Sequence, residues 1–132
     1  MSRDPRRCCS YIQSALPAIL DDFAAFDPTR KLIIVETDRS TEKQQQDYAQ
    51  GRSQRDGVHL LSMHQVQELH GEMAAHAVDF GVIVRGKYAT DRGSYEPLMV
   101  IAEVVNVEGP NCRPVDPTKL TLFEPIAVVA LK

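Results

Sequence analysis

The chain has 132 residues, of which 43% are hydrophobic and 25% charged, with a formal net charge of -3. This length and composition predict a single domain over residues 1–132 with its own hydrophobic core. We expect its first nine residues, 1–9, to form a flexible N-terminal segment. The slightly negative charge argues against a nucleic-acid-binding protein, which is usually basic. No apolar run approaches the ~20 residues of a membrane-spanning helix, and we find no secretory signal. We therefore expect neither nucleic acid nor membrane as a partner.

The three cysteines do not make an even disulfide framework. Cys8 and Cys9 are adjacent and do not readily pair with each other, and Cys112 is distant in the sequence. We interpret all three as thiols in a reducing compartment, which predicts a cytoplasmic location.

The first predicted helix runs from Ser10 to Phe26, where apolar side chains recur at spacings of three and four. Pro17 lies inside this pattern and should kink or split the helix. The β-branched run from Lys31 to Glu36 predicts a buried strand. Ser40 is a suitable N-cap for a second helix, which should end near Gly51.

In the second half of the chain, helical spacing of apolar residues predicts a helix from Met63 to Ala75, and β-branched alternation predicts a strand from Ala77 to Val84. A further helix and two closing strands are expected at Ser94–Val107, Lys119–Phe123 and Ile126–Leu131. The expected fold is α+β, with a small, mostly antiparallel sheet packed with helices.

The most informative stretch contains three of the four histidines: His64, His70 and His76. Just after them, Asp79 interrupts an apolar run, and burying a carboxylate is costly unless it is paired, hydrogen-bonded or bound to a metal. Imidazole and carboxylate together form a ligand set that suits zinc. The structural alternative is a salt bridge between Asp79 and Arg39, with His70 and His76 facing solvent and His64 in the first turn of a helix without a metal.

Two motifs resemble a known family. Arg39-Ser40 is followed by Gln44 and by the run at residues 48–52, Tyr-Ala-Gln-Gly-Arg. This pattern resembles the opening motif of zinc D-Ala-D-Ala carboxypeptidases and L-alanyl-D-glutamate endopeptidases, which include phage endolysins and the vancomycin-resistance dipeptidases. The resemblance covers roughly Ser10 to Val107.

The family's second motif is Ser-x-His-x-x-Gly-x-Ala-x-Asp. Ser62-x-His64 resembles its first half and Ala77-x-Asp79 its second half, with Ala75 at the glycine position.

The resemblance implies a D-Ala-D-Ala-peptidase-like fold, a phage or prophage origin, and release to the cell wall by another factor. His64 and Asp79 would be two of the three protein ligands to a catalytic zinc. Arg39 would direct its guanidinium at the developing oxyanion or at a substrate carboxylate. Zinc lowers the pKa of a bound water so that it can attack an amide at neutral pH. The substrate would be the peptide stem of the bacterial cell wall.

The chain departs from the family pattern in three ways. His64 and Asp79 are fifteen positions apart instead of seven, and we expect the extra residues within 65–73 to form an inserted helix. No histidine follows His76, so the third zinc ligand of the family is missing, and Lys119 stands near its position. The chain has no tryptophan, and the family's catalytic acid/base, which lies in a tryptophan-rich segment, is not found. Substitute ligands could come from His70, His76, Glu108 or Cys112.

These observations leave three functional hypotheses open. The first is a catalytically degenerate peptidase-like protein that acts by binding a stem peptide or a protein partner. The alternative is an active zinc-dependent peptidoglycan peptidase with a substitute third ligand. In the third, the likeness to the family is coincidental.

Overall fold

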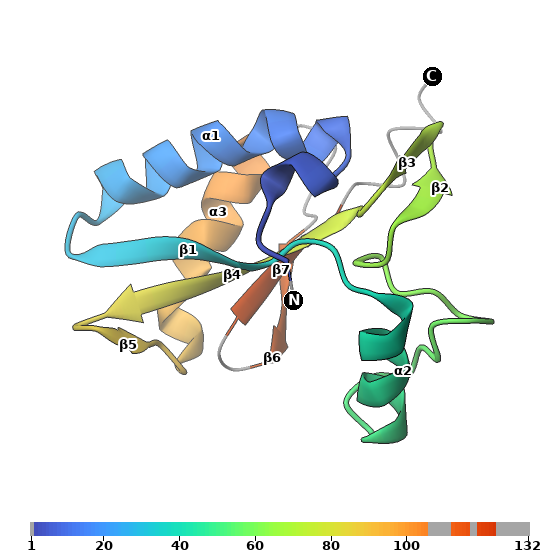
Figure 1. Ribbon diagram of the computed structural model, residues 1–132. Coiled ribbons are helices and arrows are strands. Elements are labelled where there is room, and N and C mark those ends of the chain that lie inside the picture. Colours follow the sequence, from blue (N-terminus) through green and yellow to red (C-terminus); the bar gives the residue numbers. More distant parts are fainter. Residues whose placement is uncertain (1, 106–111, 117–118, 124–132) are drawn as a thin grey trace.

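The computed structural model describes residues 2–105, 112–116 and 119–123 (Figure 1). The helices of this part are η1 (Pro5–Arg7), α1 (Ser10–Phe26), α2 (Thr41–Ala49), η2 (Arg92–Ser94) and α3 (Glu96–Val105), where η marks a short 3-10 helix. The strands are β1 (Arg30–Glu36), β2 (Gln67–Leu69), β3 (Glu72–Ala74), β4 (Ala77–Val84), β5 (Lys87–Tyr88), β6 (Cys112–Asp116) and β7 (Lys119–Phe123). No helix in these ranges is long and apolar enough to cross a membrane.

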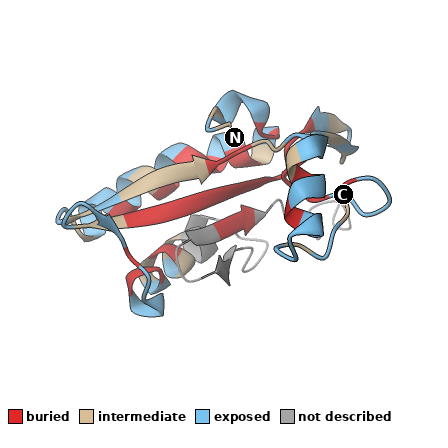
Figure 2. Ribbon diagram, turned by 60° about the horizontal axis from the view of Figure 1, so that its bottom comes forward, coloured by how far each residue is buried: buried red, intermediate tan, exposed pale blue. Residues whose placement is uncertain are grey.

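The main sheet has the strand order β1-β4-β7-β6, with β5 paired to the end of β4, and all its pairs are antiparallel. The predicted α+β class with a small antiparallel sheet is therefore confirmed. Strand β4 lies between β1 and β7 and is buried from Ala77 to Val82 (Figure 2).

The two faces of β4 carry different side chains because successive residues of a strand point to opposite faces. Val78, Phe80 and Val82 belong to the hydrophobic core, together with the apolar face of α1. Helices α1 and α3 cover this face of the sheet (Figure 1). The alternate residues Ala77 and Asp79 are also buried but point to the other face. Asp79 is therefore held on the side of the sheet away from the main core.

Helix α1 has the predicted bounds, and Pro17 does not split it. The N-cap residue Cys9 makes no side-chain hydrogen bond to the helix. Instead, the carboxylate of Glu72 in β3 accepts a hydrogen bond from the backbone N–H of Ser10 at 2.7 Å and another from the Ser10 hydroxyl. These bonds lower the pKa of Glu72. A carboxylate from a distant strand thus satisfies one of the free N–H groups at the start of α1.

The predicted helix from Met63 to Ala75 is wrong, because this segment forms the antiparallel hairpin β2–β3. The turn consists of His70 and Gly71, with φ of 55° and 80°. Two consecutive residues in the left-handed region are typical of a two-residue hairpin turn and cannot continue a right-handed helix. The inserted residues are therefore a hairpin, not a helix.

The other predicted elements agree with the structure where it describes them. Strand β1 begins one residue before the predicted start, α2 follows the Ser40 cap, and β4 and β7 have the predicted bounds. Helix α3 begins at Glu96, after η2, and not at Ser94. Its predicted end at Val107 and the predicted strand Ile126–Leu131 lie outside the described residues. Strand β6 was not predicted.

Residues 2–9 belong to the segment that was expected to be flexible, and three of them make backbone hydrogen bonds to Thr37 and Ala75. The N–H of Thr37 donates to the carbonyl of Ser2 at 2.8 Å, and Ala75 exchanges hydrogen bonds with Arg7 and Cys9. The side chains of Cys8 and Cys9 are buried. Burial, aided by the negative charges of nearby aspartates, raises the pKa of the Cys8 thiol to about 12.

Candidate metal centre

Three buried side chains converge on the face of the sheet away from the main core: Glu36, His64 and Asp79. One possible ligand atom from each lies within 4.8 Å of the other two. Glu36 ends β1, His64 lies in the loop before β2, and Asp79 is the third residue of β4. The structure thus brings together the two predicted ligands, His64 and Asp79, and adds Glu36, which our sequence analysis did not select.

A break in the strand register places Glu36 beside Asp79. Ile34 pairs with Phe80, yet Glu36 pairs with Asp79, so Val35 is an extra residue in β1. In a regular strand Glu36 would share a face with Ile34, which packs against the hydrophobic core. The bulge reverses the alternation and turns Glu36 to the face of Asp79.

Each nitrogen of the His64 imidazole lies at hydrogen-bond distance from an oxygen atom. Nδ1 lies 2.8 Å from the carbonyl oxygen of Thr37. Because a carbonyl only accepts hydrogen bonds, Nδ1 carries the hydrogen and donates it. Nε2 lies 3.0 Å from Oδ1 of Asp79, and the Thr121 hydroxyl donates to the same Oδ1. A backbone carbonyl on one imidazole nitrogen is the usual second partner of a metal-ligating histidine.

This geometry favours a cation between His64 and Asp79. In the neutral imidazole with hydrogen on Nδ1, Nε2 presents a lone pair to the carboxylate oxygen of Asp79. Two acceptors at 3.0 Å repel each other unless a proton or a metal ion lies between them. Zinc bonds of about 2.0–2.2 Å bring neighbouring ligand atoms to similar separations. The residues present therefore fit a zinc ion.

Arg39 is nearly buried, with 11% of its side chain exposed. Its Nε and Nη2 both donate to Oε1 of Glu36, and Nη1 donates to Oε1 of Gln44 at 2.8 Å. Burial alone lowers the pKa of the guanidinium, but the hydrogen bonds and charge of Glu36, with the charges of Asp79 and Asp47, raise it above its ordinary value. Arg39 is thus a permanent cation directed at Glu36. Its predicted contact with an oxyanion or substrate carboxylate stays a prediction.

Gln44 connects the site to the loop after α2. It is fully buried, and its Nε2 donates to the Ser53 hydroxyl at 2.9 Å and to the Arg55 carbonyl at 2.7 Å. Both ends of the amide are therefore used, one on Arg39 and the other on the loop.

Of the predicted substitute ligands, His70 and His76 have described side chains, and the structure does not bring them to this site. His70 forms the hairpin turn, and Nε2 of the buried His76 lies 3.0 Å from the carbonyl of Gln67. Neither belongs to the group formed by Glu36, His64 and Asp79. Cys112 begins β6 and pairs in register with Leu122. Glu108 lies outside the described residues.

Comparisons of the chain with family models, with curated proteins and with solved structures gave no significant match. The family resemblance therefore rests on the two sequence motifs, and the function on the chemistry of the site.

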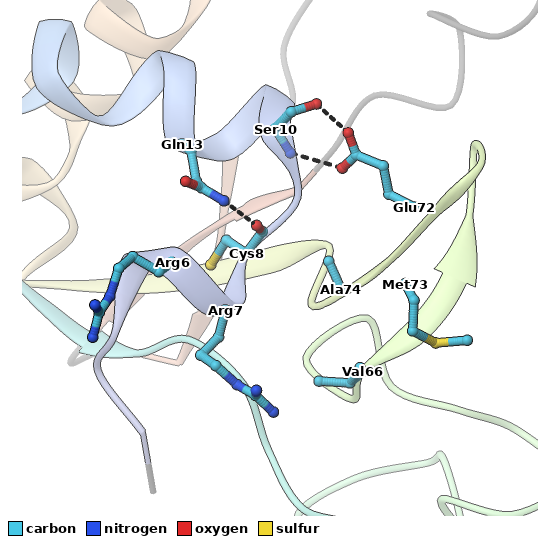
Figure 3. Close-up of a pocket in the computed structure, with 9 residues that line it drawn as sticks. All are labelled: Arg6, Arg7, Cys8, Ser10, Gln13, Val66, Glu72, Met73 and Ala74. Carbon is cyan, nitrogen blue, oxygen red and sulfur yellow. Dashed lines mark hydrogen bonds between the residues drawn. The ribbon is translucent and has the colours of Figure 1, made fainter.

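An open groove of about 420 Å³ lies between the N-terminal segment and the β2–β3 hairpin (Figure 3). Arg6, Arg7 and Glu72 provide its charged groups, and Val66 and Met73 provide exposed apolar surface. The side chains of Arg6 and Arg7 are 87% and 56% exposed, and each is paired with an aspartate.

The groove is connected to the candidate metal centre by three consecutive contacts. Arg7 bonds to Asp38 at 3.3 Å, the hydroxyl of Thr37 donates to Asp38 at 3.1 Å, and the carbonyl of Thr37 accepts from His64. Arg7 of the groove is thus linked through Asp38 to Thr37, the residue that orients His64.

Proposed function

We propose that this chain is a D-Ala-D-Ala-peptidase-like protein that binds zinc through His64 and Asp79 and recognises the peptide stem of bacterial cell wall by binding it. The orientation of His64 carries this proposal. Its Nδ1 is committed to the Thr37 carbonyl, and its Nε2 is 3.0 Å from Asp79. These are the histidine and aspartate that match the ligand positions of the family's second motif.

The surrounding residues are suited to holding a metal ion. Thr37 fixes the tautomer of His64, and Thr121 restrains the Asp79 carboxylate by donating to Oδ1. When bound at such a site, zinc polarises carbonyl groups and lowers the pKa of water.

Binding without cleavage is favoured by the groups that the sequence lacks. No histidine follows His76, so the chain lacks the histidine that provides the family's third zinc ligand. The chain also lacks the tryptophan-rich segment that carries the family's acid/base. Amide hydrolysis needs a positioned group to transfer protons, and a metal ion alone does not provide one.

We place the peptide in the groove of Figure 3. A stem peptide carries carboxylates and alanine methyl groups. Arg6 and Arg7 are each paired with an aspartate, but their guanidinium groups are exposed and match the carboxylates of the peptide. Met73, which is 67% exposed, offers apolar contact. Charge complementarity therefore supports the groove as the site of peptide recognition.

One observation favours the second candidate, an active zinc peptidase. Glu36 places a third buried donor within reach of His64 and Asp79, and catalytic zinc sites normally use three protein ligands and leave one position open. In this case the chain would cleave the stem peptide and not only bind it.

Isothermal titration of the chelator-treated protein with zinc chloride tests metal binding. We expect one zinc ion per chain, and loss of binding in His64→Ala and Asp79→Ala. The exposed His59, which pairs with Asp56 outside the site, provides the matched control, and His59→Ala should bind zinc like the wild type. Absence of zinc binding by the folded wild type would rule out the proposal.

Titration with a synthetic stem peptide ending in D-Ala-D-Ala, followed by chromatography, separates binding from cleavage. We expect the intact peptide to be recovered and Arg7→Ala to bind it more weakly. Zinc-dependent cleavage that disappears in His64→Ala would establish the second candidate instead. Failure of the wild type to bind the peptide would contradict stem-peptide recognition.

A further inference from the structure

We infer that Glu36 is the third protein ligand of the metal site and that Arg39 acts as its positioning residue, not as a substrate contact. This inference rests on the proposed zinc binding and defines the ligand set of that same site.

The strand bulge provides the first argument. Val35 is the extra residue that makes Glu36 the register partner of Asp79. Both carboxylates are buried, with 3% of Glu36 and 1% of Asp79 exposed. Like charges directly opposite each other in an antiparallel pair are destabilising. A bulge that creates such a pair is explained if a cation binds between the carboxylates, because bulges often re-aim side chains at functional sites.

The charges of the site provide the second argument. Arg39 neutralises one of the two carboxylates through its hydrogen bonds to Glu36. Asp79 is the second buried carboxylate of the pair, and its negative charge also acts on Arg39. A divalent cation between the two carboxylates would be attracted by both of them and would also accept the lone pair of Nε2 of His64.

The third argument comes from the atoms that Arg39 uses. Both of its hydrogen bonds to Glu36 end on Oε1. Among the described residues, none donates a hydrogen bond to Oε2. One oxygen of Glu36 is thus committed to an outer partner, and the other is left for a metal ion. Metal-ligating carboxylates are commonly held in this way.

Gln44 holds the guanidinium from the other side, since its Oε1 accepts from Nη1 of Arg39 at 2.8 Å. The plane of the guanidinium is therefore fixed between Glu36 and Gln44. The guanidinium of Arg39 thus orients Glu36, and its positive charge acts on the metal site through the Glu36 carboxylate.

The ligand set has a consequence for metal choice. One imidazole and two carboxylates offer more oxygen than the two imidazoles and one carboxylate that the resemblance implies for the family. Carboxylate oxygens suit harder ions such as Mn²⁺, whereas imidazole suits zinc. We expect Zn²⁺ to bind more tightly than Mn²⁺, and both ions to bind at the same site.

Titration of the chelator-treated full chain with Zn²⁺, Mn²⁺ and Co²⁺ tests the inference, with the visible spectrum of bound Co²⁺ reporting its coordination. Glu36→Gln should weaken zinc binding by more than the ~10- to 100-fold that loss of an outer partner costs, and should change the Co²⁺ spectrum. Arg39→Lys keeps the charge but loses the planar fork, and should weaken binding by about 10- to 100-fold. The exposed Glu42→Gln is the matched control and should behave like the wild type.

Glu36→Asp serves as a second variant, because it retains the negative charge opposite Arg39 but shortens the reach to the metal. In a folded protein, as judged by circular dichroism, it should also bind zinc more weakly. Wild-type zinc affinity and Co²⁺ spectrum in both folded Glu36 variants would overturn the inference while leaving zinc binding by His64 and Asp79 intact. A wild-type chain that binds no metal is a different result, which would rule out the proposed function itself.

Discussion

Glu36 and Asp79 lie opposite each other across the β1–β4 ladder, although both carboxylates are buried. Arg39 binds the first through two nitrogens, and His64 and Thr121 bind the second. The site is thus a buried pair of like charges held by an arginine, an imidazole and a hydroxyl. Its stability depends on these partners and on the elements that support them.

Thr121→Val tests the restraint on Asp79. The substitution keeps the shape of the side chain but removes the hydroxyl that donates to Oδ1. Hydrogen bonds to charged groups contribute about 1.5–3 kcal/mol, so urea unfolding of the metal-free protein should show a loss of this size. Thr90 is exposed, and Thr90→Val should change the free energy of unfolding little. An equal effect of the two substitutions would contradict the role of Thr121.

Gln44→Ala tests the connection between Arg39 and the loop after α2. Truncation leaves an N–H of Arg39 and the Arg55 carbonyl without their partner, and it also creates a cavity. Each unsatisfied buried polar group costs about 1–3 kcal/mol, so we expect a loss of about 3 kcal/mol in urea unfolding. The neighbouring Gln45 is exposed, and Gln45→Ala should be close to neutral. A small effect at Gln44 would show that the network contributes little to stability.

Gly71→Ala tests the hairpin that replaced the expected helix. Gly71 has φ of +80°, and a Cβ added there would contact nothing within 4 Å. The cost is therefore one of backbone conformation alone, about 1–2 kcal/mol for an L-residue in the left-handed region. Thermal unfolding of Gly93→Ala provides the comparison, because Gly93 does not have positive φ and a Cβ there makes only ordinary contacts. If this segment were helical, Gly71→Ala would stabilise the protein instead.

Cys8 should make the protein less stable at high pH. Burial raises the pKa of its thiol from 9.0 to about 12 in the folded state, so above pH 9 the unfolded chain loses this proton and the folded chain keeps it. The unfolded state then binds fewer protons, and the free energy of unfolding falls as pH rises from about 9 to 12. The contribution of Cys8 to this slope is at most about 1.4 kcal/mol per pH unit.

Urea unfolding at a series of alkaline pH values measures this effect. Cys8→Ala removes the thiol and should give a shallower fall in stability with pH than the wild type. Identical slopes for the two proteins would show that the Cys8 thiol ionises as readily in the folded state as in the unfolded one.

Local sequence patterns determined most of the longer helices and strands. The spacing of apolar residues gave the bounds of α1, the cap at Ser40 gave the start of α2, and the apolar run at Ala77–Val84 gave β4. These features depend on interactions within a few residues, and they can therefore be predicted from the sequence. The motif pattern likewise selected His64 and Asp79, which lie 3.0 Å apart in the fold.

The segment from Met63 to Met73 shows where a local pattern is ambiguous. The apolar residues Met63, Val66, Leu69 and Met73 have helical spacing, but Val66 and Met73 are 40% and 67% exposed and do not form a core face. The turn at His70–Gly71 decides the structure of this segment. The pairing of Glu72 with the start of α1 adds a long-range restraint that no local pattern contains.

The sequence by itself determined where α1, α2 and the central strand lie, and two of the three converging donors. Only the tertiary structure added Glu36, although this carboxylate closes an apolar run much as Asp79 interrupts one. The physical reason is the bulge at Val35, which shifts the register between β1 and β4 and moves Glu36 from the core face to the face of Asp79. Strand register is set by pairing between distant segments, and for this reason the complete ligand set appears only in the folded chain.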